Sequence, residues 1–222
     1  MGRLMVIDGL DGCGKSTQLD LLDASLKDAG IAYRMISFPD YDQPSSALVK
    51  MYLGGELGGS PAAVNAYAAS SFFAVDRYAS YRKFWESDYL AGVPIVAARY
   101  TTSNAIHQMT KLPESAWNDY LAWLDDYEYC KLGLPCPDRV VFLDMPLEVS
   151  QRLMSARYDG HEERKDLHER DLDYLASCRH AALAIAERQG WTVIPCSDGN
   201  DPLPLEVIHR EIRRIFRETT GV

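Results

Sequence analysis

Short apolar runs alternate with longer stretches of helical periodicity along the whole chain. The apolar runs have the length of buried strands, and the stretches between them repeat apolar residues every three to four positions, as helices that cover a sheet do. The predicted strands are 4–8, 33–38, 94–98, 139–144 and 191–196. The predicted helices are 15–29, 44–53, 61–85, 103–111, 113–129, 147–156, 168–189 and 203–217.

Strands that are separated by helices pair in parallel, because each helix returns the chain to the same edge of the sheet. We therefore expect an α/β fold of three layers, with a five-stranded parallel sheet and helices on both faces. No linker or repeat divides the chain, so one domain is expected over residues 1–222. Its most polar stretch, 157–166, is either a solvated loop or a mobile lid.

The net charge of −9 argues against binding to nucleic acid or to a membrane surface. No apolar run approaches the roughly 20 residues of a membrane-spanning helix. A cytoplasmic protein without nucleic-acid or membrane partners is therefore expected. In an acidic protein, clustered arginines become informative about anionic ligands.

The cysteines show no C-x-x-C pair, and free thiols in a reducing compartment are expected. They are Cys13, Cys130, Cys136, Cys178 and Cys196. We expect semi-buried packing for Cys130, Cys178 and Cys196. Cys13 lies near Lys15 and a predicted helix N-terminus, both of which lower the pKa of a thiol, so its oxidation is expected to block nucleotide binding.

The strongest motif follows the first predicted strand. Residues 9–16 read Gly-Leu-Asp-Gly-Cys-Gly-Lys-Ser, the pattern of a phosphate-binding loop between a strand and a helix. The glycines let backbone N–H groups turn toward phosphate oxygens, and the helix adds its positive end. Lys15 supplies charge for the β- and γ-phosphates, and the Ser16 hydroxyl suits Mg²⁺. The predicted ATP-binding residues are Gly9, Gly12, Cys13, Gly14, Lys15, Ser16 and Thr17.

Two further groups of residues suit an acceptor nucleotide. Phe73 and Arg77 are four positions apart on one helix face, where the ring can stack on a base and the guanidinium can donate to a base carbonyl. A core Phe beside a surface Arg gives the same spacing. Arg99 ends the third predicted strand, where a buried guanidinium needs an anion. Three polar residues follow closely: Ser103, Asn104 and His107.

In this order, the motifs resemble the thymidylate kinases, which transfer the γ-phosphoryl group of ATP to dTMP and form dTDP. Besides the three groups above, the similar segments are Phe38-Pro39, Arg99-Tyr100, Ser103-Asn104-Ala105, 132–138, 140–144 and His168-Glu169-Arg170. The resemblance covers essentially the whole chain. It implies ATP and dTMP as substrates, Mg²⁺ as cofactor, a homodimer to which helix 61–85 contributes, and a short lid over about 155–167.

The resemblance also implies roles for single residues. Four of them read thymine: Phe73 by stacking, and Arg77, Ser103 and Asn104 by hydrogen bonds. Asp11 takes the position that contacts the sugar 3′-hydroxyl, and His107 that of an aromatic side chain that crowds the 2′ position and so selects deoxyribose. Phe38-Pro39 resembles the family's corner after the second strand, often with a cis bond. On the phosphate side, Lys15 and Arg99 are expected to be catalytic, with Asp8 and Ser16 at the metal.

Members of the family differ in where a catalytic arginine lies. Some carry it in the phosphate loop, but this chain has Gly12 and Cys13 there. Others carry arginines in the lid, and here the candidates are Arg157 and, behind it, Arg152 and Arg164. Such an arginine neutralises charge on the transferring phosphoryl group, which is worth several orders of magnitude in rate.

One departure from the family's pattern concerns the metal. The family's Asp before Arg99 is Ala98 here, and that carboxylate helps to organise Mg²⁺ and the phosphates. Three interpretations stay open: the chain is slow or inactive, Asp8 holds the metal's waters alone, or Asp144 assists. Because a nucleotide kinase attacks with a phosphate that is already anionic, Ala98 favours a monophosphate acceptor over a nucleoside.

A second departure concerns the acceptor phosphate. Ser37 stands where many members have an arginine that clamps this phosphate, and Arg34, Lys50 or Arg99 are the candidates to replace it. Two other functions therefore stay open. One is a kinase for another deoxynucleotide or deoxynucleoside, and the other is a nucleotide-binding protein with weak catalysis.

Overall fold

The computed structural model describes residues 1–157 and 171–222, with only the backbone of residues 156 and 157. Most of the expected lid, 155–167, therefore lies outside the described residues, as does Arg164. The first residues of the predicted helix 168–189 lie outside them too.

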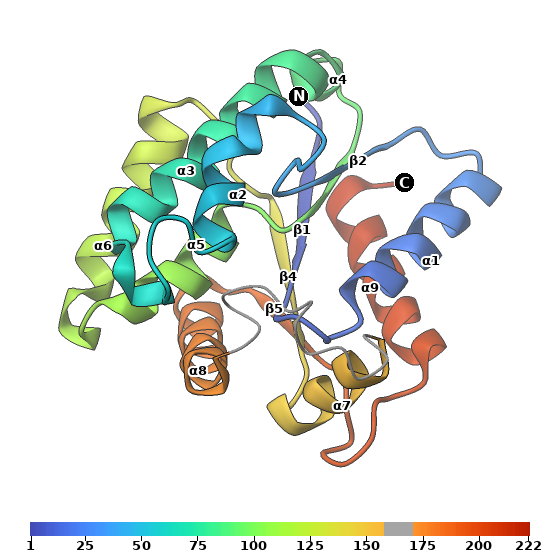
Figure 1. Ribbon diagram of the computed structural model, residues 1–222. Helices are drawn as coiled ribbons and strands as arrows, with labels where there is room; N and C mark the ends of the chain where they lie inside the picture. Colours follow the sequence, from blue (N-terminus) through green and yellow to red (C-terminus); the bar gives the residue numbers. More distant parts are fainter. Residues whose placement is uncertain (158–170) are drawn as a thin grey trace.

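The five predicted strands all form, and they pair in parallel in one sheet. They are β1 (Leu4–Asp8), β2 (Arg34–Ser37), β3 (Ile95–Ala98), β4 (Arg139–Asp144) and β5 (Thr192–Pro195). Their spatial order is β2-β3-β1-β4-β5, with β1 in the centre (Figure 1). The expected α/β fold is confirmed.

The helices of the described chain surround this sheet. They are α1 (Lys15–Asp28), α2 (Ala47–Leu53), α3 (Ala66–Ser80), α4 (Glu86–Leu90), α5 (Thr101–Gln108), α6 (Trp117–Asp125), α7 (Leu147–Arg157), α8 (Leu172–Gln189) and α9 (Leu205–Thr220). Short 3₁₀ turns occupy Pro44–Ser46, Pro61–Ala63, Met109–Lys111 and Glu114–Ala116. π-helical turns occupy Tyr81–Trp85 and Asp126–Lys131. None of the helices in the described part of the chain is long and apolar enough to cross a membrane.

Several predicted helices begin at other residues, and two of these differences concern the helices next to the site. The predicted helix 61–85 starts at Ala66, because the Asn65 side chain accepts a hydrogen bond from the backbone N–H of Ala68 at 2.9 Å and so caps the helix there. The predicted helix 103–111 starts at Thr101, directly after β3. Ser103 and Asn104 consequently lie in the first turn of α5, close to the strand end.

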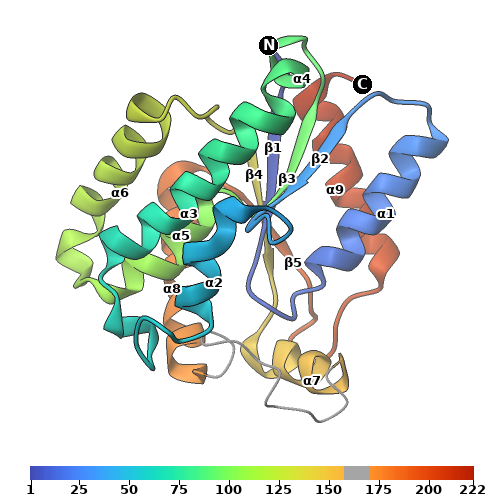
Figure 2. The ribbon, with the colours of Figure 1, turned by 45° about the horizontal axis from the view of Figure 1, so that its top comes forward.

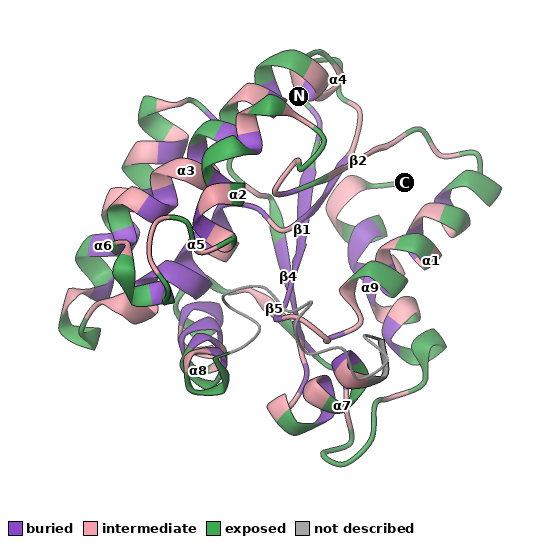
Figure 3. Cartoon of the chain, in the orientation of Figure 1, coloured by how far each residue is buried: buried purple, intermediate pink, exposed green. Residues whose placement is uncertain are grey.

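Alternate residues of each strand face the two helical layers. Met5 and Ile7 of β1 pack with α1 and α9, while Leu4 and Val6 pack in the cluster that holds Trp85. In Figures 1 and 2, α1 and α9 lie on one side of the sheet, and α3, α5 and α6 lie on the other. Figure 3 shows buried residues along the strands and on the inner helix faces. The core is thus the apolar sheet and the helix faces turned to it.

The strand register brings three chain segments to one edge. Ile7 pairs with Ala98, and Ser37 also pairs with Ala98, so the carboxyl ends of β1, β2 and β3 are level. Such an edge is where ligands of open parallel sheets bind. The loop after β1, the corner after β2 and the start of α5 all open onto it.

Candidate active site

The loop between β1 and α1 has the geometry of a phosphate cradle. Gly12 and Gly14 adopt left-handed φ angles of 79° and 87°. A Cβ at Gly12 would lie 2.7 Å from the Ser150 carbonyl oxygen, so this position requires glycine on both grounds. Lys15 Nζ donates to the Gly9 carbonyl oxygen at 3.1 Å, which folds the lysine back over the loop.

The expectation that its neighbours lower the pKa of the Cys13 thiol is wrong, whereas the effect of its oxidation on nucleotide binding stays a prediction. Its side chain is only 2% exposed, and burial raises the pKa of the thiol although Lys15 lowers it. Desolvation of the thiolate outweighs the neighbouring charge. Burial likewise raises the pKa of Cys178 and of Cys196 to about 12. Cys130 is exposed rather than semi-buried.

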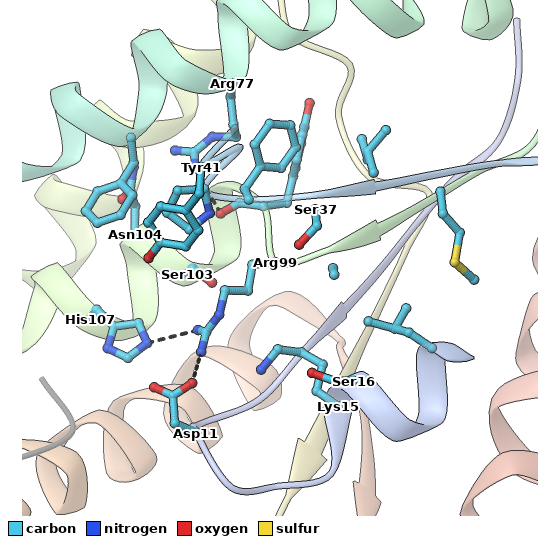
Figure 4. Close-up of a pocket in the computed structure, with 18 of the residues that line it drawn as sticks. Asp11, Lys15, Ser16, Ser37, Tyr41, Arg77, Arg99, Ser103, Asn104 and His107 are labelled. Carbon is cyan, nitrogen blue, oxygen red and sulfur yellow. Dashed lines mark hydrogen bonds and ion pairs between the residues drawn. The ribbon is translucent and has the colours of Figure 1, made fainter. Parts of the chain in front are cut away.

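A pocket of about 690 Å³ opens at this edge of the sheet (Figure 4). It is lined by predicted residues from the phosphate loop and from the acceptor side: Asp11, Lys15, Ser16, Phe38, Pro39, Phe73, Arg77, Arg99, Ser103, Asn104 and His107. Seven other lining residues were not among the candidates from the sequence: Leu19, Asp20, Met35, Ile36, Tyr41, Leu53 and Gln108. Gln108 has a buried Oε1 with no hydrogen-bond partner in the described chain.

Arg99 stands between the two halves of the pocket. It has a left-handed φ of 61°, which is unusual for a residue with a side chain. Its guanidinium forms an ion pair with Asp11, lies 3.3 Å from His107 Nε2 and 3.7 Å from Asp8 Oδ1. Burial lowers the pKa of Arg99, but the carboxylates of Asp11 and Asp8 outweigh it and leave the pKa raised. The Arg99 guanidinium therefore stays charged, and the carboxylates of Asp11 and Asp8 are the anions that a buried arginine at this position was predicted to need.

Asp8 is fully buried and accepts three hydrogen bonds. The Gly9 N–H donates to it at 2.8 Å, Thr102 Oγ1 at 2.6 Å and Ser103 Oγ at 2.7 Å. The Ser103 hydroxyl, which the resemblance assigns to thymine, donates to Asp8, and Ser103 also lines the pocket. This contact ties the first turn of α5 to the end of β1.

Several candidate residues lie away from the pocket. Both oxygens of Asp144 accept from Arg179, at 2.7 and 2.8 Å, so this carboxylate is committed elsewhere. Arg152 donates to the Asn200 carbonyl and lies 3.3 Å from Asp201, outside the pocket lining. Of the other proposed lid arginines, Arg157 has no described side chain and Arg164 lies outside the described residues.

Of the three candidates for an acceptor-phosphate clamp, only Arg99 lines the pocket. Arg34 lies at the start of β2 and pairs with Asp88 at 2.7 Å. Lys50 is exposed on α2. Both Ser37 and Ala98 line the pocket, so the two departures from the family pattern do bear on the site.

Arg77 is buried and paired rather than free on the surface. Its Nε and Nη2 donate to the two oxygens of Glu128 at 2.7 and 2.5 Å, and Nη1 donates to the Tyr100 carbonyl at 3.3 Å. Burial lowers the pKa of Arg77, and Glu128 more than restores it. No sequence pattern indicates Glu128, which lies 51 positions away on a π-helical turn.

Two predicted aromatic residues, Phe73 and Phe38, line the pocket from different segments of the chain. Phe73 is partly buried on α3 and lines the pocket, with the ring of Tyr52 edge-on at 6.1 Å. The Phe38-Pro39 bond is cis, as the resemblance implies, and Phe38 packs 6.0 Å from the Tyr100 ring.

Comparisons with known proteins agree with this geometry. The family model described as "Thymidylate kinase" matches residues 7–212. Thymidylate kinases of two Mycobacterium tuberculosis strains, CDC 1551 / Oshkosh and ATCC 25618 / H37Rv, are each 33% identical over 195 residues, which is 85% of this chain and 87% of theirs. One from Rhodopirellula baltica is 26% identical over 187 residues, 82% of this chain and 68% of that protein. The solved structure of the Candida albicans thymidylate kinase has a TM-score of 0.70 at 20% identity over 98% of this chain and 92% of that chain, a likeness of fold.

Proposed function

The chain belongs to the thymidylate kinase family, and from that premise we propose how its residues transfer the γ-phosphoryl group of ATP to dTMP. The observation that carries the proposal is one shared cavity. Lys15 and Ser16 of the phosphate loop line the same pocket as Phe73, Arg99 and Asn104. A donor on the loop and an acceptor in the pocket then meet at the carboxyl edge of β1 and β3.

The donor triphosphate lies on the loop and on the first turn of α1. The backbone N–H groups around Gly12 and Gly14 bind its oxygens, and Thr17 is exposed in the same turn. Lys15 places its ammonium group beside the β- and γ-phosphates. In Figure 4, Lys15 and Arg99 reach toward the same part of the pocket.

Magnesium is the metal that the family's reaction implies, and the chain fits an ion held mainly by the substrate. Ser16 is exposed at the head of α1, where its hydroxyl can be a ligand. Asp8 already accepts three hydrogen bonds, so it would act through water, and Ala98 offers no side-chain oxygen. Mg²⁺ keeps several waters and binds substrate phosphates with few protein ligands. When bound, it would neutralise charge on the donor phosphates.

The acceptor is held by its phosphate, sugar and base. Arg99 turns from Asp11 to the acceptor phosphate and bridges it to the donor. The freed Asp11 then accepts from the 3′-hydroxyl, and His107 crowds the 2′ position. Phe73 stacks on the base. Catalysis comes from positioning and charge neutralisation without a covalent intermediate, because the attacking phosphate oxygen is already anionic.

A weakly catalytic nucleotide-binding protein is the second candidate function. Ala98 carries no carboxylate and lines the pocket at the end of β3, which favours this candidate over a change of substrate. The lid arginines at 157 and 164 would decide how far the lost carboxylate matters, since they add positive charge at the transferring group.

We also propose a single domain that forms a cytoplasmic homodimer through α3. Tyr67, Val75 and Tyr78 are 40%, 41% and 40% exposed on this helix. Large apolar side chains gathered on one exposed face favour a protein interface. Sedimentation of the native chain and of Val75→Asp tests this proposal, and a monomeric native chain would refute it.

The test of the function is ADP formation from ATP·Mg²⁺ with one acceptor at a time. The acceptors are dTMP, dUMP, dCMP, dGMP and thymidine. We expect activity with dTMP above all others and none with thymidine. Tight binding of ATP and dTMP without ADP would favour the weakly catalytic protein, and preference for another acceptor would refute the assignment of dTMP.

A further inference from the structure

Glu128 joins the two side chains that face the acceptor base. It lies on the π-helical turn after α6 and is fully buried. Its carboxylate accepts two hydrogen bonds from Arg77 of α3 and a third, at 2.9 Å, from Asn104 Nδ2 of α5. One carboxylate thereby fixes two pocket residues that come from different helices.

The orientation of the Asn104 amide follows from its partners. Nδ2 lies 2.9 Å from Glu128 Oε1 and 3.1 Å from the Ser70 carbonyl oxygen. Both partners are acceptors, so only the NH₂ group can occupy this place, and both of its hydrogens are used. The Oδ1 atom, which has no partner among the described residues, is left for the pocket that Asn104 lines.

The orientation of the Arg77 guanidinium follows in the same way. Three of its five N–H donors are used by Glu128 and by the Tyr100 carbonyl. The remaining N–H groups are on Nη1 and Nη2, and Arg77 lines the pocket. Figure 4 shows Arg77 and Asn104 on the same wall of the pocket. The wall therefore offers a donor from α3 beside an acceptor from α5.

We propose that Glu128 is a positioning residue that sets the choice of acceptor base, an inference that rests on the proposed function. The donor and acceptor that it fixes match a base with a carbonyl beside a ring N–H, as in thymine and uracil. Cytosine offers an amino group beside an unprotonated ring nitrogen. It therefore presents a donor where thymine has an acceptor, and an acceptor where thymine has a donor. With cytosine, the Arg77 donor would face a donor and the Asn104 acceptor would face an acceptor. Buried polar groups without a partner are costly, so the site should discriminate strongly against this base.

Removal of the Glu128 charge should undo this choice. Glu128→Gln replaces one of the two acceptor oxygens by an NH₂ group, which cannot accept a hydrogen bond. That NH₂ group must face either Arg77 Nε or the two nitrogens that now share Oε1, Arg77 Nη2 and Asn104 Nδ2. Either placement releases a fixed partner, and in the second the Asn104 amide can turn its NH₂ group to the pocket. Glu128→Asp keeps the charge, but its shorter side chain cannot reach both helices.

The experiment measures kcat/KM for dTMP and for dCMP in the native chain, Glu128→Gln, Glu128→Asp and Tyr120→Phe. Tyr120 is a matched control, because its hydroxyl bonds Ser70 Oγ at 2.6 Å and the Asn104 carbonyl at 3.3 Å without touching the Asn104 amide. We expect the ratio of dTMP to dCMP to fall at least about tenfold in both Glu128 variants and to stay unchanged in Tyr120→Phe. The KM for ATP should not change. An equal loss for both acceptors would overturn the proposal and leave Glu128 a structural residue.

Two further measurements keep the outcomes separate. If Glu128→Gln does not fold, as judged by its melting transition, Glu128→Asp carries the test. If the native chain binds dTMP without turning it over, the proposed function fails, and the ratio of Kd values for dTMP and dCMP tests Glu128 instead. If the enzyme is active and the folded Glu128 variants keep the native ratio of kcat/KM for dTMP to that for dCMP, the role of Glu128 is refuted while the proposed function stands.

Discussion

Arg99 and Asp11 form an ion pair across the ends of β3 and β1. In the proposed mechanism, the acceptor phosphate replaces Asp11 as the partner of Arg99 within the pocket. The Asp11 carboxylate holds the partly buried guanidinium of Arg99 in place and so positions its charge in the pocket.

Replacement of Arg99 by lysine should therefore damage transfer. A lysine cannot present the planar fork that contacts several anions at once, so we expect kcat/KM for dTMP to fall about 10- to 100-fold. Steady-state kinetics measure this. Arg34→Lys is the control, because Arg34 pairs with Asp88 outside the pocket lining and should leave the rate unchanged. Full activity of Arg99→Lys would remove Arg99 from the mechanism.

Phe73→Ala should weaken dTMP binding by about 1–3 kcal/mol, because a stacked base would lose its aromatic platform. Calorimetric titration with dTMP measures the loss. Phe72→Ala serves as the control, since Phe72 packs 6.4 Å from the Tyr52 ring but is absent from the pocket lining. Equal affinities of the native chain and Phe73→Ala would assign Phe73 to packing.

Lys111 should make stability depend on pH. Its Nζ donates to the Val64 carbonyl at 2.8 Å and to the Tyr52 hydroxyl at 3.0 Å, and burial lowers its pKa from 10.5 to about 8. Between these values the folded chain loses the proton while the unfolded chain keeps it, so stability rises with pH. Relative to Lys111→Met, we expect the free energy of unfolding to rise by about 1–2 kcal/mol between pH 8 and pH 10, allowing for partial exposure.

Urea unfolding of the native chain and of Lys111→Met at several pH values from 8 to 10 gives the difference between their free energies of unfolding. The contributions of the other titrating groups cancel in this difference. A difference that stays flat from pH 8 to pH 10 would show that burial does not shift the Lys111 ammonium.

Thiol labelling of the native chain should leave nucleotide binding intact. Cys130 and Cys136 are exposed, whereas Cys13 is buried and burial raises its pKa. We expect a thiol reagent to modify Cys130 first and to leave Cys13 unmodified, as mass spectrometry of peptides would reveal. Rapid modification of Cys13 with loss of ATP binding would restore the reactive thiol that its neighbours in sequence suggest.

Local patterns predicted the strands and the phosphate loop well, because short apolar runs and the glycine spacing carry their own physical reasons. The lining of the pocket also followed, since residues after parallel strands meet at one edge. The pKa of Cys13 was predicted in the wrong direction, because the sequence shows the charge of Lys15 but not the burial of the thiol. The hydrogen bond from Ser103 to Asp8 could not be predicted, because it joins segments 95 positions apart.

Glu128 was missed for a related reason. Nothing near it in the sequence indicates a partner, and its role arises only where α3, α5 and the turn after α6 meet. Long-range polar contacts of this kind depend on tertiary packing, which neither periodicity nor motif spacing encodes. The same holds for Asp144, whose carboxylate accepts hydrogen bonds from Arg179 of α8, a partner that the sequence does not indicate.

The most direct test of the account is formation of dTDP from ATP·Mg²⁺ and dTMP by the purified chain, with Lys15→Ala and Ala98→Asp beside it. We expect dTDP from the native chain, none from a folded Lys15→Ala, and a higher kcat in Ala98→Asp, whose carboxylate would lie at the end of β3 next to Asp8. Undiminished dTDP formation by Lys15→Ala, or no dTDP from either the native chain or Ala98→Asp, would contradict the account.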